Sequence, residues 1–252
     1  MKVQLLPSAP GNEPNQHLTT YLIDDEVAID AGSLGLALDP VRQARIGHVL
    51  VTHSHADHVL SLPMFVNNAL DHGAGVSIYG SSPTIDCLRR DVFNDRLWPD
   101  LTRLSSGGAP PVKLEVLESL TPVTIGRFTV TPVEVHHAVP TLGFVVDDGT
   151  SAVAFSSDSG PTHALWRLAS RLPHLRAVFM GAPFPDALLE LAIVSGHLTP
   201  RLFGCEAAKL PREVRLVAVH LKPAYRARVE RELAELGLDT LSIGIPGHDY
   251  VF

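Results

Sequence analysis

The chain has 252 residues, 45% of them hydrophobic and 19% charged, a composition that allows a sizeable core and excludes a globally disordered protein. Its formal net charge of −7 argues against a protein whose main partner is nucleic acid. The sequence has no run of about 18 apolar residues and no signal-peptide pattern, so we expect a cytoplasmic protein without a membrane partner.

Strands and helices alternate through the first part of the chain. Apolar and alternating segments predict strands over 2–7, 17–24, 26–32, 46–52 and 76–80. Helical periodicity predicts helices over 34–45, 56–73 and 82–94. The second and third strands flank a polar turn and are typical of a hairpin.

The second part begins with four β-rich segments and then alternates again. The β-rich segments cover 112–119, 123–135, 141–148 and 151–159. Helices are predicted over 161–172, 185–194 and 225–237, and strands over 177–183, 213–223 and 238–246. Two β-rich halves flanked by helices predict an α/β protein, a four-layer αββα sandwich in a single domain over 1–252. The functional site is expected where loops leave the sheet edges.

The stretch "HSHADH" carries His53, His55, Asp57 and His58 directly after an apolar strand. Side chains two apart in extended chain point the same way, so the first two histidines can converge on one metal ion. The aspartate and the third histidine begin the next helix and can reach a second ion. Imidazole and carboxylate suit zinc first, and also manganese or iron. The alternative is a solvated polar turn with chance histidines.

A two-metal reading requires more ligands, and the sequence offers them at later strand ends. His136 and His137 end an alternating strand, Asp158 follows an apolar one, and His220 follows another. A single histidine at a strand end is more often structural. Three such positions in one chain favour a metal site.

These motifs, with "AIDAG" at Asp30 before them, resemble the metallo-β-lactamase fold superfamily over nearly the whole chain. The resemblance implies a αββα sandwich with two divalent metal ions. His53, His55 and His137 would bind one ion, Asp57, His58 and His220 the other, and Asp158 would bridge them. Asp30 would brace the ligand loop as a hydrogen-bond acceptor. His137 is chosen over His136 because "HAVPTLGF" resembles the phosphodiesterase branches.

Two such ions hydrolyse esters by making hydroxide available from a shared water and polarising the substrate oxygen. Asp57 is counted with the catalytic residues as well as with the ligands. His197, in "SGHLTP", matches a histidine that assists the leaving group in related phosphodiesterases, although the segment could also be a polar capping loop. Lys222 follows His220 by two residues and would face the negative charge of the substrate, or be a solvated lysine.

The substrate class is indicated by "FNDRLWP", "HLTP" and "HLKP", which together resemble class II cyclic-nucleotide phosphodiesterases. That resemblance predicts hydrolysis of 3′,5′-cyclic nucleotides such as cyclic AMP to 5′-nucleotides. Asn94 and Trp98 would contact the base, unless the aromatic residues of this loop are core anchors. Ala56 and Leu60 depart from the family pattern.

Three alternatives remain. A tRNA 3′-processing endonuclease fits "HAVPTLGF" but calls for a basic arm that the sequence lacks. A thioesterase or lactonase would have no use for the "FNDRLWP" loop. A sensor that binds metal or nucleotide without catalysis is the non-enzymatic alternative. The expected partner is a small-molecule phosphodiester, and a homodimer is the commonest assembly.

Overall fold

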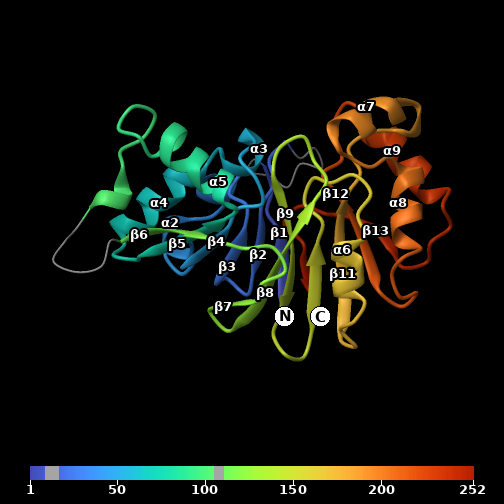
Figure 1. The fold of residues 1–252 in the computed structure, drawn as a ribbon, viewed down its shortest axis with the longest axis horizontal. Coiled ribbons are helices and arrows are strands. Elements are labelled where there is room, and N and C mark those ends of the chain that lie inside the picture. Colours follow the sequence, from blue (N-terminus) through green and yellow to red (C-terminus); the bar gives the residue numbers. More distant parts are fainter. Residues whose placement is uncertain (9–16, 105–110) are drawn as a thin grey trace.

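The first of two sheets is formed by the N-terminal part of the chain and the last strand. A computed structural model describes residues 1–8, 17–104 and 111–252, and within them the strands form two seven-stranded sheets (Figure 1). The first has the order β14-β1-β2-β3-β4-β5-β6. Its strands are β1 (Lys2–Leu5), β2 (Tyr21–Ile23), β3 (Val27–Ile29), β4 (His48–Leu50), β5 (Val76–Gly80), β6 (Val112–Val116) and β14 (Asp249–Val251).

The second sheet has the order β13-β12-β11-β10-β9-β8-β7. Its strands are β7 (Val123–Ile125), β8 (Phe128–Val135), β9 (Thr141–Asp147), β10 (Ala152–Phe155), β11 (Leu175–Gly181), β12 (Arg215–Val219) and β13 (Leu241–Ile243). Strands β10, β11 and β12 pair in parallel, whereas β7 to β10 are antiparallel neighbours.

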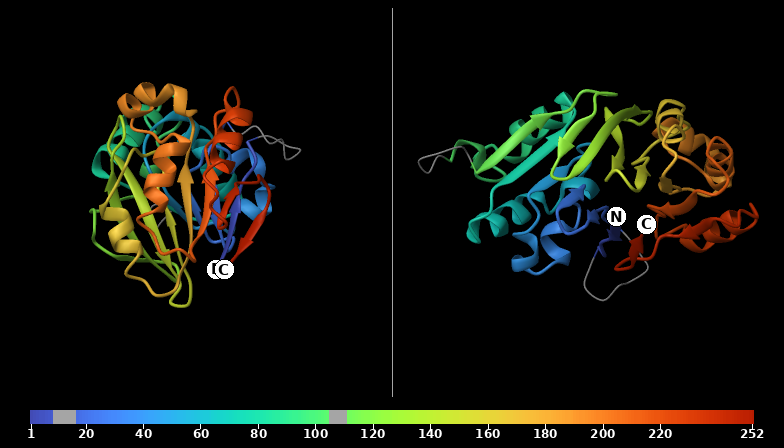
Figure 2. Two further views of the ribbon diagram at one scale, coloured as in Figure 1. Left: turned by 90° about the vertical axis from the view of Figure 1, so that its right-hand side faces the viewer. Right: turned by 90° about the horizontal axis from the view of Figure 1, so that it is seen from below.

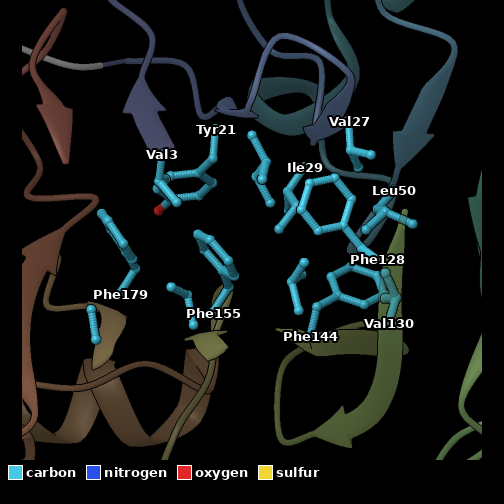
Figure 3. Close-up of a cluster of buried hydrophobic side chains, with 14 of the residues drawn as sticks. Val3, Tyr21, Val27, Ile29, Leu50, Phe128, Val130, Phe144, Phe155 and Phe179 are labelled. Carbon is cyan, nitrogen blue, oxygen red and sulfur yellow. The ribbon is translucent and has the colours of Figure 1, made fainter. Parts of the chain in front are cut away.

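Apolar side chains from both sheets form one core between them (Figure 3). Phe155 and Phe179 of the second sheet stack with ring centroids 5.1 Å apart. Tyr21 of the first sheet contacts Phe155 at 5.1 Å and Phe179 at 5.5 Å. Burying rings of this size is the main stabilising term available at the interface between the sheets.

Helices cover the outer face of each sheet. On the first sheet lie α1 (Leu34–Ala37), α2 (Pro40–Gln43), α3 (Ala56–Val59), α4 (Leu62–Asp71) and α5 (Ser82–Cys87), continued by a π-helical turn (Leu88–Val92) and a 3₁₀ turn (Leu101–Arg103). The second sheet is covered by α6 (Ala164–Ala169), α7 (Leu189–Ser195), α8 (Pro200–Ala207) and α9 (Arg226–Ala234), and a 3₁₀ turn (Asp186–Leu188) precedes α7. The four predicted layers are therefore confirmed.

Prolines divide two of the predicted helices. Pro40 begins α2 behind Asp39, whose carboxylate accepts a hydrogen bond from the backbone N–H of Arg42, so 34–45 forms two short helices. Pro63 lies in the first turn of α4 and separates it from α3. The predicted strand 123–135 is a hairpin of β7 and β8.

Strand β14 was not predicted. Its three residues become a strand only by pairing with β1 at the other end of the chain, and the two termini lie side by side in both views of Figure 2. In the described part of the chain, every helix is too short or too polar to cross a membrane.

Candidate metal centre

Five predicted site residues follow the carboxyl ends of strands. Asp30 follows β3 and His53 follows β4, and these two strands are parallel. His137 follows β8, Asp158 follows β10 and His220 follows β12, which run in one direction because β8 and β10 are both antiparallel to β9. Parallel strands end at the same edge of a sheet, so the topology gathers these side chains at one edge of the sandwich.

One group of potential ligands contains three histidines and Asp158, and its ligand atoms all lie within 4.8 Å of one another. Nδ1 of His55 is 3.0 Å from Nε2 of His53 and 3.3 Å from Nε2 of His137. Lone pairs at this spacing repel one another unless a proton or a cation lies among them. His136, the alternative at this strand end, is exposed and outside the group.

A second group contains Asp57, His58, Asp158 and His220, again within 4.8 Å. Nε2 of His58 is 3.5 Å from Oδ2 of Asp158 and 3.7 Å from Oδ2 of Asp57. Nε2 of His220 is 3.3 Å from Oδ2 of Asp158. Nε2 of His58 is buried without a hydrogen-bond partner, an arrangement that costs free energy unless an ion binds there. The donor set therefore fits two divalent ions with Asp158 common to both groups.

One carboxylate orients a histidine in each group. Asp30, only 1% exposed, accepts a hydrogen bond of 2.7 Å from Nδ1 of His58 and one of 2.9 Å from the hydroxyl of Thr52. The Thr52 oxygen in turn accepts from Nδ1 of His53 at 3.0 Å. Each histidine thus directs its Nε2 lone pair inward, which is how protein ligands are held for a metal. Thr52 was not among the residues predicted from the sequence, although it directly precedes the motif.

Two further histidines are oriented by groups distant in sequence. Nδ1 of His137 donates to the carbonyl of Gly196 at 3.1 Å, and Nδ1 of His220 is 3.2 Å from the hydroxyl of Thr19. Gly196 has a φ of +66°, and a Cβ there would lie 2.5 Å from Cα of His137. Only glycine lets the two segments approach this closely. No local sequence pattern identifies either partner.

The backbone is also unusual at this edge. Asp30, Ser157 and His220 are non-glycine residues in the left-handed region, with φ of 60°, 55° and 55°. This conformation costs about 1–2 kcal/mol per residue. Such strain concentrates at functional sites, where the surrounding structure enforces it.

Charges within the second group shift two ionisation equilibria. Burial alone would raise the pKa of Asp158, but His220 and His58 outweigh it and hold that pKa well below its usual range. Burial alone would lower the pKa of His58, yet Asp30 and Asp158 raise it well above its usual value. In the absence of an ion, His58 therefore carries a proton, which an incoming cation must displace.

The first group behaves in the opposite way. Burial, helped by neighbouring histidines, lowers the pKa of His53 and of His55, so their rings are neutral and their lone pairs are available. Burial also lowers the pKa of His197 to about 4. The ring of His197 lies beside the group, 4.8 Å from the ring of His137.

A cavity of about 660 Å³ opens beside the two groups, within the usual size of small-molecule sites. Asp57, His197 and His220 line it, together with Lys222. The Lys222 ammonium lies 4.2 Å above the ring of Phe184, close enough for a cation–π contact. Lys222 and His197 therefore lie in one cavity with Asp57 and His220 of the second ligand group.

Asn94 and Trp98 lie elsewhere, in the loop after α5 at the outer end of the first sheet (Figure 1). The Asn94 side chain holds its own loop, since it accepts hydrogen bonds from the N–H groups of Arg96 and Leu97 and donates to the carbonyl of Arg90. Trp98 packs beside the buried Phe93 on the outer core of that sheet. The structure does not bring these two residues to the cavity, and their contact with substrate stays a prediction.

Comparison with known proteins agrees with this geometry. A family model described as the beta-lactamase superfamily domain matches residues 26–221. A probable 3′,5′-cyclic-nucleotide phosphodiesterase from Yersinia pestis is 24% identical over 86% of this chain and 77% of its own length. Ribonuclease Z from Bradyrhizobium sp. (strain ORS 278) is 37% identical, but over only 37% of this chain and 29% of that protein.

Among solved structures, unliganded yeast PDE1 superposes with a TM-score of 0.79 at 20% sequence identity, covering 100% of this chain and 99% of the other. The likeness in fold extends over all the strands that carry the two ligand groups. With the family match over residues 26–221, it confirms the resemblance inferred from the sequence. The chain therefore belongs to the metallo-β-lactamase superfamily.

Proposed function

We propose that this chain is a metal-dependent phosphodiesterase that hydrolyses 3′,5′-cyclic nucleotides to 5′-nucleotides. The observation that carries the proposal is the pair of ligand groups sharing Asp158, beside a cavity that also contains Lys222 and His197. The names of the Yersinia relative and of the yeast structure support the same substrate class.

In this proposal the two ions are zinc, and each of the two ligand groups described above would hold one of them. When bound, such ions supply an activated water and polarise the phosphoryl oxygen. Asp57 is half-exposed at the cavity wall, so its second carboxylate oxygen can accept a proton from water while the first faces the ligand group. Manganese or iron would suit the same donors, and metal analysis distinguishes them.

His197 is proposed to assist the leaving oxygen. Its ring lies between the ring of His137 at 4.8 Å and that of Phe184 at 5.5 Å, and its backbone N–H is fixed to the carbonyl of Ala192. Because its pKa is about 4, the ring is neutral at pH 7 and offers one N–H as a hydrogen-bond donor. The negative charge of a bound phosphodiester raises this pKa and so favours the imidazolium form, which can donate its proton to the leaving oxygen and return to the neutral ring.

Lys222 is proposed to hold the substrate phosphate. Its ammonium is fixed above Phe184 at the mouth of the cavity, where it lowers the electrostatic cost of bringing an anion beside the Asp57 carboxylate.

The predicted homodimer and cytoplasmic location stay predictions.

The test is a turnover screen of metal-loaded protein with cyclic AMP, cyclic GMP, a bis-aryl phosphate, a thioester and a pre-tRNA. The proposal expects 5′-nucleotide from at least one cyclic nucleotide. The variant His197→Ala should keep its metal content and lose most of this activity, because His197 lies beside the ligands and is not among them. Cleavage of the thioester alone, with no phosphodiester turned over, would refute the proposal.

A tRNA 3′-processing activity is the second candidate, favoured by the local similarity to ribonuclease Z. It requires a surface that binds a long polyanion, which the formal net charge of −7 opposes. Cleavage of pre-tRNA without turnover of cyclic nucleotides would decide for it.

A further inference from the structure

Three aromatic rings line the cavity beside the candidate metal centre, and we call them the aromatic wall: His197, Phe184 and Tyr225. Phe184 follows β11, and Tyr225 directly precedes α9. The ring centroids of Phe184 and Tyr225 are 6.1 Å apart, and the ring of Phe184 also lies 5.5 Å from the ring of His197. Phe184 therefore contacts both of the other rings.

Phe184 and Tyr225 differ in what they offer to a ligand. Phe184 is 4% exposed and lies beneath the Lys222 ammonium. Tyr225 is half-buried and lines the cavity. Between Phe184 and Tyr225, the accessible ring is therefore that of Tyr225.

Apolar residues line the cavity together with Tyr225. Pro223 and Ala224 come from the same loop, and Leu191 contributes from α7 on another part of the chain. Leu191 is 47% exposed, an unfavourable environment for a leucine that a flat apolar ligand group would improve. A cavity that combines the charge of Lys222 with apolar and aromatic side chains matches a nucleotide, which has a phosphate at one end and a base at the other.

The position of Tyr225 is well fixed. Its backbone N–H donates to the carbonyl of Lys222, and its own carbonyl accepts from the N–H groups of Arg228 and Val229 at the start of α9. Its ring packs on the outer core of the second sheet. A ring held in this way loses little conformational entropy when a base stacks on it.

Resting on the proposed function, we propose that Tyr225 is the platform on which the nucleobase stacks, while Lys222 holds the phosphate. The loop of Asn94 and Trp98, which the sequence suggests for this task, lies at the outer end of the other sheet. The structure thus assigns base recognition to a different residue from the one that the sequence motif indicates.

The test measures the contribution of the base to binding, independently of turnover. The dissociation constants of 5′-AMP and of ribose 5-phosphate are measured by calorimetry on metal-loaded protein. Stacking of one base on an aromatic ring corresponds to a preference for 5′-AMP of about 5-fold to 150-fold. Tyr225→Leu keeps an apolar side chain of similar bulk and should reduce that preference to about 2-fold or less, whereas Tyr225→Phe should retain it.

Two further variants make the result specific. Tyr79→Leu makes the same exchange at a half-buried tyrosine of β5 that lies outside the cavity, and should leave the preference unchanged. Leu191→Glu puts a charge into the apolar lining of the cavity and leaves Tyr225 itself unchanged, and it should weaken 5′-AMP binding more than ribose 5-phosphate binding. This variant also tests the wall if Tyr225→Leu does not fold.

The inference is overturned if wild-type protein binds both ligands equally, if Tyr225→Leu keeps the preference, or if Trp98→Leu removes it instead. A separate measurement isolates the proposed function: wild-type protein should turn over methyl 4-nitrophenyl phosphate, a phosphodiester without a base. If wild-type protein cleaves no phosphodiester at all, the proposed function fails. If wild-type protein cleaves a phosphodiester but its preference for 5′-AMP over ribose 5-phosphate is the same in Tyr225→Leu, only the proposed role of Tyr225 fails.

Discussion

Replacing Asp30 by asparagine removes the charge that orients one histidine in each ligand group. The carboxylate accepts three short hydrogen bonds, from the N–H of Thr52 at 2.8 Å, from its hydroxyl at 2.9 Å and from Nδ1 of His58 at 2.7 Å. A hydrogen bond to a charged group is worth about 1 kcal/mol more than a neutral one. Moreover, the groups that surround Asp30 all donate hydrogen bonds to it. The NH₂ group of an asparagine would also be a donor, so it would find no acceptor among them.

The loss at Asp30 should appear as weaker metal binding. Removing a group that orients metal ligands typically costs 10-fold to 100-fold in affinity, about 1.4–2.8 kcal/mol, which agrees with the loss of charge from three bonds. We expect Asp30→Asn to lower zinc affinity by this factor, measured by competition with a chromophoric chelator. The affinity for both ions should fall, because the hydroxyl of Thr52 is hydrogen-bonded both to Asp30 and to His53, a ligand of the other group.

Asp147→Asn is the matched control. Asp147 accepts a hydrogen bond of 2.9 Å from His174 and so also belongs to an aspartate–histidine pair, here a partly buried one. Asp147 ends β9, whereas the ligand groups lie at the opposite edge of the sheet. It should lower stability slightly and leave zinc affinity unchanged. Equal zinc affinities for wild-type protein and Asp30→Asn would refute the reasoning that this carboxylate orients the ligands.

Three further predictions concern other parts of the site. Asp158→Asn should reduce the metal content from two ions to one by mass spectrometry, because Asp158 is common to both groups; two retained ions would exclude a bridging role. Gly196→Ala should lower the free energy of unfolding in urea by more than the 1–2 kcal/mol of a left-handed alanine, because its Cβ meets His137; Gly237→Ala has a similar φ of +61° and free space around it, and an equal loss in both would contradict the close approach. Between pH 6.5 and 4 the unfolded chain protonates His197 whereas the folded chain does not, so metal-free protein should lose stability as the pH falls through this window. Without that ring, in His197→Gln, the loss should be smaller by about 3 kcal/mol, and equal pH dependence of the two proteins would contradict a pKa of about 4.

Each predicted ligand position is tied to a local signal in the sequence. His53, His55, Asp57 and His58 form one motif, and His137, Asp158 and His220 each follow an apolar strand. The place where a strand ends can be predicted from the local sequence. Because parallel strands end at the same edge of a sheet, the residues that follow them are then expected to lie close together. For the same reason the αββα layers could be inferred from the order of elements.

What the sequence did not reveal depends on contacts between distant segments. Thr19 reaches His220, and Gly196 reaches His137, across 201 and 59 residues of chain. Strand β14 exists only through its pairing with β1. Conversely, the "FNDRLWP" motif is a strong sequence signal, yet the side chain of Asn94 is used to hold its own loop. A motif is a pattern of residue types, whereas the role of its side chains depends on where the fold places them.

The central claim is that one chain holds two ions and uses them to hydrolyse a cyclic phosphodiester. It is tested most directly by measuring metal content and turnover of cyclic AMP and cyclic GMP on the same sample, with the product identified. The account predicts two divalent ions per chain, 5′-nucleotide as product, and loss of both after chelation. A single ion per chain, or two ions with no turnover of either cyclic nucleotide, would contradict it.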